Sequence, residues 1–265
     1  MYEFDYRRPN TLDEALEALR TAPDGKLLAG GQTLLPTLKQ RLANPSDLID
    51  LAHIQDLKGI SVEGDTLVIG AMTRHAEVAT SPDVRARIPA LAELAGDIGD
   101  RQVRNRGTIG GSIANNDPAA DYPAACLGLN ATITTDRREI GADDFFTDLF
   151  ETALVEDEVV VAVRFPVPVR AAYMKFKNPA SRYAIVGVFV AQNSDGVRVA
   201  VTGAGASGVF RVPEMEAALA ADFATGAIEG IAVPQDDLNS DIHASAEYRA
   251  HLVGVMARRA VAACG

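Results

Sequence analysis

The chain has 265 residues, of which 48% are hydrophobic and 23% are charged, and its formal net charge is −11. These values are typical of a globular protein of one to three domains and argue against disorder. So acidic a chain is unsuited to binding nucleic acid, and no basic stripe with interleaved aromatic residues reverses this.

The first 57 residues predict a small parallel sheet built from a β-α-β pattern. Thr11 and Glu14 have the spacing of a capping box, and the apolar residues that follow share one helical face. A short strand is expected over residues 26–29, then a helix-like stretch over 33–42 and another strand over 47–51. No signal peptide or membrane helix is predicted, so we expect a cytoplasmic protein without a membrane span.

The middle of the chain, from about residue 58 to 166, predicts a larger mixed or antiparallel part. Two strands are expected around a turn at residues 63–65. The further elements expected are a helix over about 82–95, a glycine-rich segment over 107–111, and strands over 131–135 and 159–165.

The C-terminal part, residues 167–265, is expected to be a separate domain that follows a linker at Pro166 and Pro168. Its pattern predicts an antiparallel meander with strands over 173–177, 185–191 and 197–201. The last twenty or so residues predict an amphipathic helix with arginines near its end. The expected fold class is therefore α+β, with subdomains at about 1–57 and 58–166 forming one domain and 167–265 forming the second.

Two glycine-containing segments indicate where a ligand binds. The first is AGGQTL at residues 29–34, and the second is TIGGS at 108–112, with Asp121 further along. Glycine lets the backbone approach a ligand closely and adopt positive φ, so that several N–H groups converge on one anion. This arrangement suits a pyrophosphate. Each glycine pair, taken alone, favours a tight turn over a ligand site.

Other nucleotide and catalytic motifs are absent or incomplete. No GxxxxGK[ST] sequence occurs, which disfavours ATP or GTP hydrolysis. GAGASG at residues 203–208 matches a dinucleotide fingerprint, but no helix is expected before about Glu214, so a turn is favoured. There is no GxSxG elbow and no HExxH, and Cys126 and Cys264 are too few for a four-thiolate metal site. We therefore expect no metal site and no catalytic residue in this chain.

With these segments identified, the sequence resembles the FAD-binding medium subunits of the xanthine dehydrogenase and carbon monoxide dehydrogenase family. Residues 29–42 are similar to the family's first FAD loop, and 107–131 are similar to its second. Further similarity covers 150–166, 173–191 and 241–261, so the resemblance spans nearly the whole chain.

The resemblance implies a PCMH-type FAD-binding domain in which two N-terminal subdomains hold the flavin and the C-terminal domain partly covers it. Residues 29–34 and 108–112 would bind the pyrophosphate and adjoining groups, and Tyr183 would lie near the isoalloxazine. Gln32-Thr33 replaces a frequent His-Ser, which is expected to alter one flavin hydrogen bond without abolishing the site. The expected cofactor-binding residues are Ala29, Gly30, Gly31, Gln32, Thr33, Leu34, Ile98, Thr108, Ile109, Gly110, Gly111, Ser112, Asp121, Val160, Lys177 and Tyr183.

The implied function is electron transfer within a larger oxidoreductase. A small subunit with 2Fe–2S clusters would reduce the FAD, which would pass electrons to a quinone, oxygen or NAD. A large subunit with the molybdenum cofactor would oxidise the substrate, and the expected assembly is a dimer of heterotrimers. Two alternatives stay open: a self-contained FAD-dependent oxidase, and a cofactor-free assembly protein of the same fold. The extra iron–sulfur cluster of one family branch is excluded, because two cysteines cannot hold it.

Overall fold

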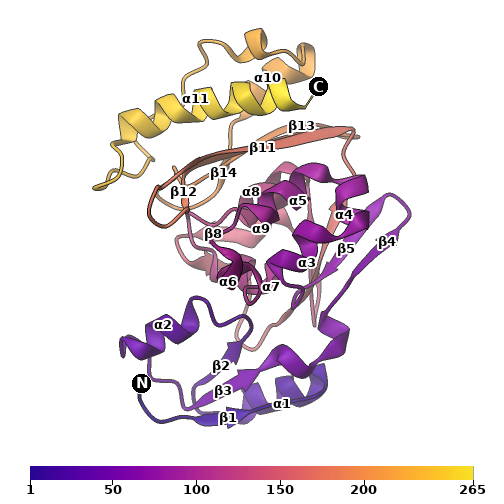
Figure 1. Ribbon diagram of the computed structural model, residues 1–265, viewed down its shortest axis with the longest axis vertical. Helices are drawn as coiled ribbons and strands as arrows, with labels where there is room; N and C mark the ends of the chain where they lie inside the picture. Colours follow the sequence, from indigo (N-terminus) through magenta and orange to yellow (C-terminus); the bar gives the residue numbers. More distant parts are fainter. Residues whose placement is uncertain (265) are drawn as a thin grey trace.

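The computed structural model describes residues 1–264, and its sheets follow one another along the long axis of the molecule. Figure 1 shows the N-terminal strands at one end and the two longest C-terminal helices at the other, with the middle sheet and its helices between them. A parallel N-terminal sheet, an antiparallel middle sheet and a C-terminal antiparallel sheet covered by helices are all present, so the predicted α+β fold class is confirmed.

The N-terminal part is a three-stranded parallel sheet in the order β1-β3-β2. The first helix begins after Thr11, whose hydroxyl accepts a hydrogen bond of 3.2 Å from Glu14 N. The Glu14 carboxylate accepts from Asn10 N, one residue before the position that a capping box requires. The elements are β1 (Asp5–Arg7), α1 (Leu12–Thr21), β2 (Gly25–Leu28), α2 (Leu34–Lys39), β3 (Asp47–Asp50) and the 3-10 helices η1 (Leu51–His53) and η2 (Gln55–Leu57).

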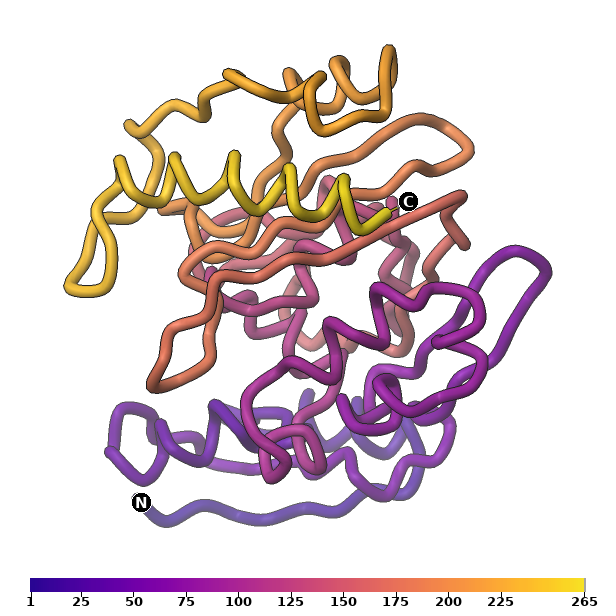
Figure 2. The backbone as a smooth tube through the Cα atoms, turned by 45° about the horizontal axis from the view of Figure 1, so that its top comes forward, coloured from indigo at the N-terminus to yellow at the C-terminus, as the bar shows by residue number. Residues whose placement is uncertain are grey.

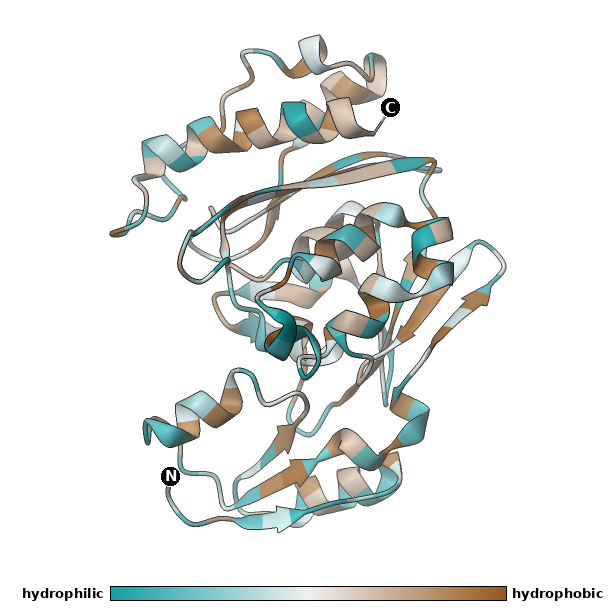
Figure 3. Ribbon diagram, in the orientation of Figure 1, coloured by the Kyte–Doolittle hydropathy of each residue, from teal (hydrophilic) through white to brown (hydrophobic). Residues whose placement is uncertain are grey.

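The middle part is a five-stranded antiparallel sheet in the order β4-β5-β10-β6-β7. Its strands place apolar side chains such as Leu67, Ile69 and Val163 in the core, in the period of two that a half-buried strand requires. Figure 3 shows hydrophobic residues along β5 and a mostly hydrophilic α6 (Arg101–Arg104) at the surface. The strands are β4 (Ile60–Glu63), β5 (Thr66–Gly70), β6 (Thr132–Thr135), β7 (Glu139–Gly141) and β10 (Val160–Pro166), with a small hairpin β8 (Phe146–Asp148) and β9 (Glu151–Thr152).

The single helix expected over 82–95 is two helices, α4 (Pro82–Arg87) and α5 (Pro89–Gly96). Pro89 has no N–H to continue the first helix, and it holds Ile88 in a non-helical conformation with φ −137° and ψ 71°. The prediction of one continuous helix was wrong for that reason. The other helices of this part are α3 (His75–Thr80), α7 (Ile109–Asn115), α8 (Tyr122–Gly128) and α9 (Ala142–Phe145).

The C-terminal sheet has the order β11-β12-β13-β14 and is buried on both faces. Helices α5 and α8 pack on one face, and α10 and α11 pack on the other. Accordingly nine of the ten residues of β12 are buried. Figure 2 shows the loop between β11 and β12 reaching toward the N-terminal part. The elements are β11 (Arg170–Lys177), β12 (Ala184–Asn193), β13 (Gly196–Thr202), β14 (Phe210–Arg211), α10 (Pro213–Ala221), η3 (Thr225–Ile228) and α11 (Ala246–Ala263).

The GAGASG sequence is a loop between the antiparallel strands β13 and β14, which confirms the interpretation as a turn. Gly203 has φ +82°, and its carbonyl oxygen accepts a hydrogen bond of 2.9 Å from the buried Arg249. Arg249 also donates to Ile185 O at 2.6 Å, so this guanidinium ties α11 to the sheet. No helix starts within the glycines, and the dipole that a dinucleotide site uses is therefore missing here.

Candidate functional site

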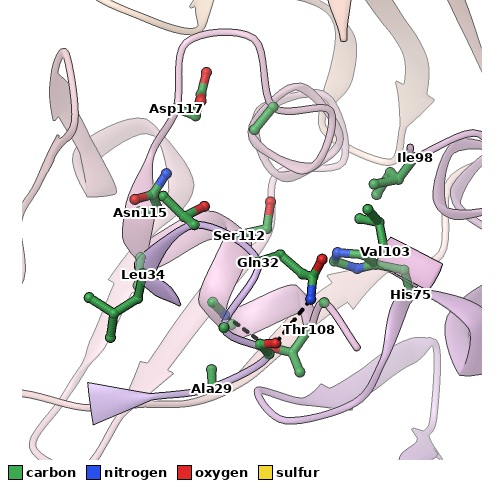
Figure 4. Close-up of a pocket in the computed structure, with 18 of the residues that line it drawn as sticks. Ala29, Gln32, Leu34, His75, Ile98, Val103, Thr108, Ser112, Asn115 and Asp117 are labelled. Atoms are coloured by element: carbon green, nitrogen blue, oxygen red, sulfur yellow. Dashed lines mark hydrogen bonds between the residues drawn. The ribbon is translucent and has the colours of Figure 1, made fainter. Parts of the chain in front are cut away.

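One cavity of about 620 Å³ collects residues from all three parts of the chain. Its wall combines the segment after β2, the first turn of α7, residues 117–121, the start of β10 and the β11–β12 loop. Figure 4 shows side chains from several of these segments around the same space. The volume lies within the range of about 300–1,000 Å³ that small-molecule and cofactor sites occupy.

The first glycine segment offers free backbone donors to this cavity. Gly31 has φ +72°, in the left-handed region that favours glycine. A Cβ at Gly30 would lie 2.3 Å from the carbonyl oxygen of Arg106, so glycine allows this segment to touch the chain leading into α7. Within residues 1–264, the N–H groups of residues 31–33 donate no hydrogen bond. Consecutive free N–H groups form a concave site for an anion.

The second glycine segment is built differently, because its backbone donors are already in use. The N–H groups of residues 109–112 donate to Thr73 O, to Ala71 O and twice to Thr108, which caps α7. Neither glycine has a positive φ. The expectation of free N–H groups and left-handed backbone therefore holds for the first segment only. Here glycine serves close packing, since a Cβ at Gly110 would lie 2.5 Å from Ala71 Cβ.

The cavity brings together all but two of the residues expected to bind a cofactor. Ile109 is fully buried beneath the second segment and does not line the cavity. The Lys177 side chain is 43% exposed and pairs with Asp97. The expected residues that line the cavity are Ala29, Gly30, Gly31, Gln32, Thr33, Leu34, Ile98, Thr108, Gly110, Gly111, Ser112, Asp121, Val160 and Tyr183.

A buried cluster of charged and polar side chains lies next to one wall of the cavity. Asp121 precedes α8 without capping it, and its carboxylate accepts from the Tyr173 hydroxyl at 2.5 Å and from Lys175 Nζ at 2.9 Å. Burial raises the pKa of Asp121, while the Lys175 ammonium and the Tyr173 hydroxyl oppose that shift. Lys175 also donates to Asp97 O at 3.0 Å. We call Asp97, Asp121, Tyr173 and Lys175 the Asp121 cluster.

A histidine that the sequence did not single out also lines the cavity. His75 is buried, and burial, with the nearby Arg104 charge, lowers its pKa to about 4, so the imidazole is neutral near pH 7. Its Nδ1 has no hydrogen-bond partner within residues 1–264. Such an atom is destabilising unless a ligand or water satisfies it. His75 packs beside Tyr122, whose hydroxyl also lacks a partner in the described chain.

Two further features concern metals and membranes. Residues 1–264 contain no group of three or more His, Cys, Asp or Glu side chains arranged to hold a metal ion. In the same residues, no helix combines the length and the apolarity needed to cross a membrane.

Comparison with known proteins finds matches along the whole chain. A family described as "FAD binding domain in molybdopterin dehydrogenase" matches residues 2–168. The carbon monoxide dehydrogenase medium chain of Hydrogenophaga pseudoflava is 38% identical over 278 residues, covering 97% of this chain and 96% of that protein. The nicotine 6-hydroxylase medium subunit of Paenarthrobacter nicotinovorans is 36% identical over 275 residues, covering 98% and 96%.

Solved structures agree with these matches. The carbon monoxide dehydrogenase structure from Hydrogenophaga pseudoflava superimposes with a TM-score of 0.87 at 38% identity, covering 99% of this chain and 97% of that one. Quinoline 2-oxidoreductase from Pseudomonas putida 86 gives a TM-score of 0.89 at 30% identity, covering 99% and 96%. The similarity therefore includes the C-terminal sheet and its helices as well as residues 2–168.

Proposed function

The chain belongs to the family of FAD-binding medium subunits of the molybdenum hydroxylases, and we propose that it is the electron-transfer subunit of such an enzyme. It is thus a subunit of an oxidoreductase of the carbon monoxide, aldehyde and xanthine dehydrogenase type. When bound, FAD supplies the capacity to take electrons from 2Fe–2S clusters and pass them to an external acceptor such as a quinone, oxygen or NAD. We propose that residues 1–166, with subdomains at about 1–57 and 58–166, form the FAD-binding domain and that residues 167–265 form the C-terminal domain.

The observation that carries this proposal is the free N–H row of residues 31–33 in the wall of the cavity. FAD is an anion with a pyrophosphate at its centre, and a chain of net charge −11 needs such a local donor site to attract it. The volume of about 620 Å³ and the unpaired Nδ1 of His75 also fit a large polar ligand. The residues present therefore fit FAD.

In this proposal each wall of the cavity has its own task. Residues 29–34 hold the pyrophosphate, while Ser112 adds its hydroxyl from α7. Asp121 accepts a hydrogen bond from the cofactor, and Ile98 and Val160 contribute apolar surface. Tyr183 is half-exposed on the β11–β12 loop, where it can shield the flavin from water. Lys177, Thr108, Ile109, Gly110 and Gly111 complete the proposed set, and Ile109 supports it from beneath.

The proposed partners are a small subunit with 2Fe–2S clusters and a large subunit with the molybdenum cofactor, assembled as a dimer of heterotrimers in the cytoplasm. Hydroxylation of a carbon atom in substrates such as purines and aldehydes requires an oxo-metal centre. The chemistry of the organic substrate therefore belongs to the large subunit, and this chain binds and orients the flavin.

The test compares the purified chain with the assembled enzyme. After acid precipitation, FAD should remain in the supernatant, because neither glycine segment contains a Cys, His or Tyr that could form a covalent flavin link. The chain alone should not turn over carbon monoxide, purines or aldehydes, whereas mixing the three subunits should restore substrate-dependent flavin reduction in stopped-flow absorbance. Turnover of an organic substrate by the chain alone, at on the order of 10 per second, would identify a self-contained oxidase instead. A chain that binds no flavin even after reconstitution would point to an assembly protein.

A further inference from the structure

Lys175 has a buried side chain that contacts residues of the cavity wall on the side away from the cavity. Its side chain is 1% exposed, and it does not itself line the cavity. Its Nζ lies 2.9 Å from Asp121 Oδ1, 3.0 Å from Asp121 Oδ2 and 3.0 Å from Asp97 O. A buried ammonium is strongly destabilising unless it is paired, so all of its donors are directed at these two residues.

Both residues that Lys175 contacts belong to segments of the cavity wall. Asp121 lines the cavity, and Asp97 immediately precedes Ile98 and Gly99, which line it as well. Gly187, which pairs with Lys175 between β11 and β12, leaves the space that the Tyr173 hydroxyl occupies beside Asp121. A Cβ there would lie 2.2 Å from the Tyr173 hydroxyl, which would displace that hydroxyl from Asp121.

We infer that Lys175 is a positioning residue for the cofactor: it keeps the Asp121 carboxylate ionised and oriented in the wall of the FAD site. This inference rests on the proposed function. Without the ammonium, Asp121 would be a buried carboxyl with one remaining donor, Tyr173. Such a carboxyl takes up a proton more readily, and its protonated form is a poorer acceptor for a hydrogen bond from the cofactor.

The other ionisable groups around Asp121 do not supply the same charge. They come from several elements: Tyr173 on β11, Asp97 at the end of α5, Tyr122 on α8, and Tyr183 with Asp117 at the cavity. Within residues 1–264, Lys177 pairs with Asp97 and not with Asp121. Removal of Lys175 therefore leaves Asp121 with no cation in contact, and the affinity for FAD should become dependent on pH.

The test measures the Kd for FAD by quenching of flavin fluorescence, on the full chain stripped of flavin, between about pH 6 and pH 8. Wild-type affinity should vary by less than about threefold, since its carboxylate stays paired. Lys175→Met should lose affinity as the pH falls, by up to about tenfold per pH unit. Lys175→Arg should restore the flat profile because it keeps the charge. Lys39→Met, at an exposed position near the end of α2, is the matched control.

A double variant separates this role from a general loss of folding. Asp121→Asn with Lys175→Met removes both charges and leaves no unpaired buried ion. If Lys175 acts through Asp121, this variant should bind FAD within about threefold of Asp121→Asn alone, with no pH dependence. A profile of Lys175→Met parallel to wild type, or a double variant at least about tenfold weaker than Asp121→Asn, would overturn the inference. A wild-type chain that binds no FAD would instead refute the proposed function.

Discussion

Replacing Gly30 by alanine tests whether the contact between the first glycine segment and the chain leading into α7 matters. The added Cβ would lie 2.3 Å from Arg106 O and 2.7 Å from Gly107 Cα, both of them backbone atoms. Ordinary contact needs about 3.4 Å, so the first segment must move by roughly 1 Å away from the chain leading into α7. No side chain can rotate to relieve this overlap.

The expected losses are in both stability and FAD affinity. Overpacking of this kind costs about 1–3 kcal/mol, which corresponds to a fall in Tm of about 2–10 °C for a chain of this size. Displacing the N–H groups of residues 31–33 by roughly 1 Å should weaken FAD binding by about 10–100-fold. The stability loss should remain when FAD is absent, because the overlap is within the protein.

The assay combines thermal unfolding with titration of FAD against the flavin-free chain. Gly226→Ala is the matched control, since a Cβ there meets no atom within 4 Å and its φ is not positive. This variant should keep the wild-type Tm and Kd. If Gly30→Ala also kept both, the close contact between the first segment and the chain leading into α7 would not be needed, and the reasoning would be refuted.

Three other variants or treatments have definite expected outcomes. In Gly111→Val the added Cβ would lie 3.0 Å from Thr108 Oγ1 and 3.3 Å from Ala29 Cβ, and its methyl groups would extend into the cavity, so Kd for FAD should rise by on the order of tenfold or more, with an unchanged circular dichroism spectrum; wild-type affinity would contradict this. The Arg138 guanidinium, more than any other group, lowers the pKa of Glu158 to about 2. Its carboxylate therefore adds stability above the unfolded pKa of about 4.3 that is lost as the pH falls toward 2. Glu158→Gln should flatten the dependence of Tm on pH in that window, and an unchanged slope would exclude this pair as the cause. Burial raises the pKa of the Cys126 thiol, so iodoacetamide should modify this residue only in denaturant, as mass spectrometry of its peptide can show; modification in the native protein would contradict its burial.

Much of the fold follows from local patterns in the sequence. The Thr11 cap, the alternation in the strands and the helix over 246–263 depend on neighbouring residues, and the structure confirms each of them. The break at Pro89 was equally local and could have been predicted, because proline cannot continue a helix. Both glycine segments were found from sequence because a close backbone approach requires glycine.

The details of the site depend on contacts that are distant in sequence. Side chains of a strand point alternately to its two faces, so those of residues 173, 175 and 177 share one face of β11. The sequence pattern therefore predicts three polar groups side by side. The same pattern does not predict that the Lys175 side chain is buried against Asp121 while that of Lys177 is exposed. This difference follows from the way α5 and α8 pack on the sheet. In the same way, the N–H groups of Ile109 and Gly110 donate to Thr73 O and Ala71 O, which lie far earlier in the chain.

The order of the middle sheet has a consequence for synthesis on the ribosome. Its central strand, β10, pairs with both β5 and β6, yet it is the last strand of that sheet to be translated. The N-terminal sheet is complete once β3 has emerged, whereas β5 and β6 each keep an unpaired edge until residue 166 has left the exit tunnel. Exposed edges of this kind recruit other chains. A nascent chain that has emerged only as far as residue 150 would therefore expose two such edges at the place where Val160 later joins the cavity wall, and this interval is when chaperones would be needed most.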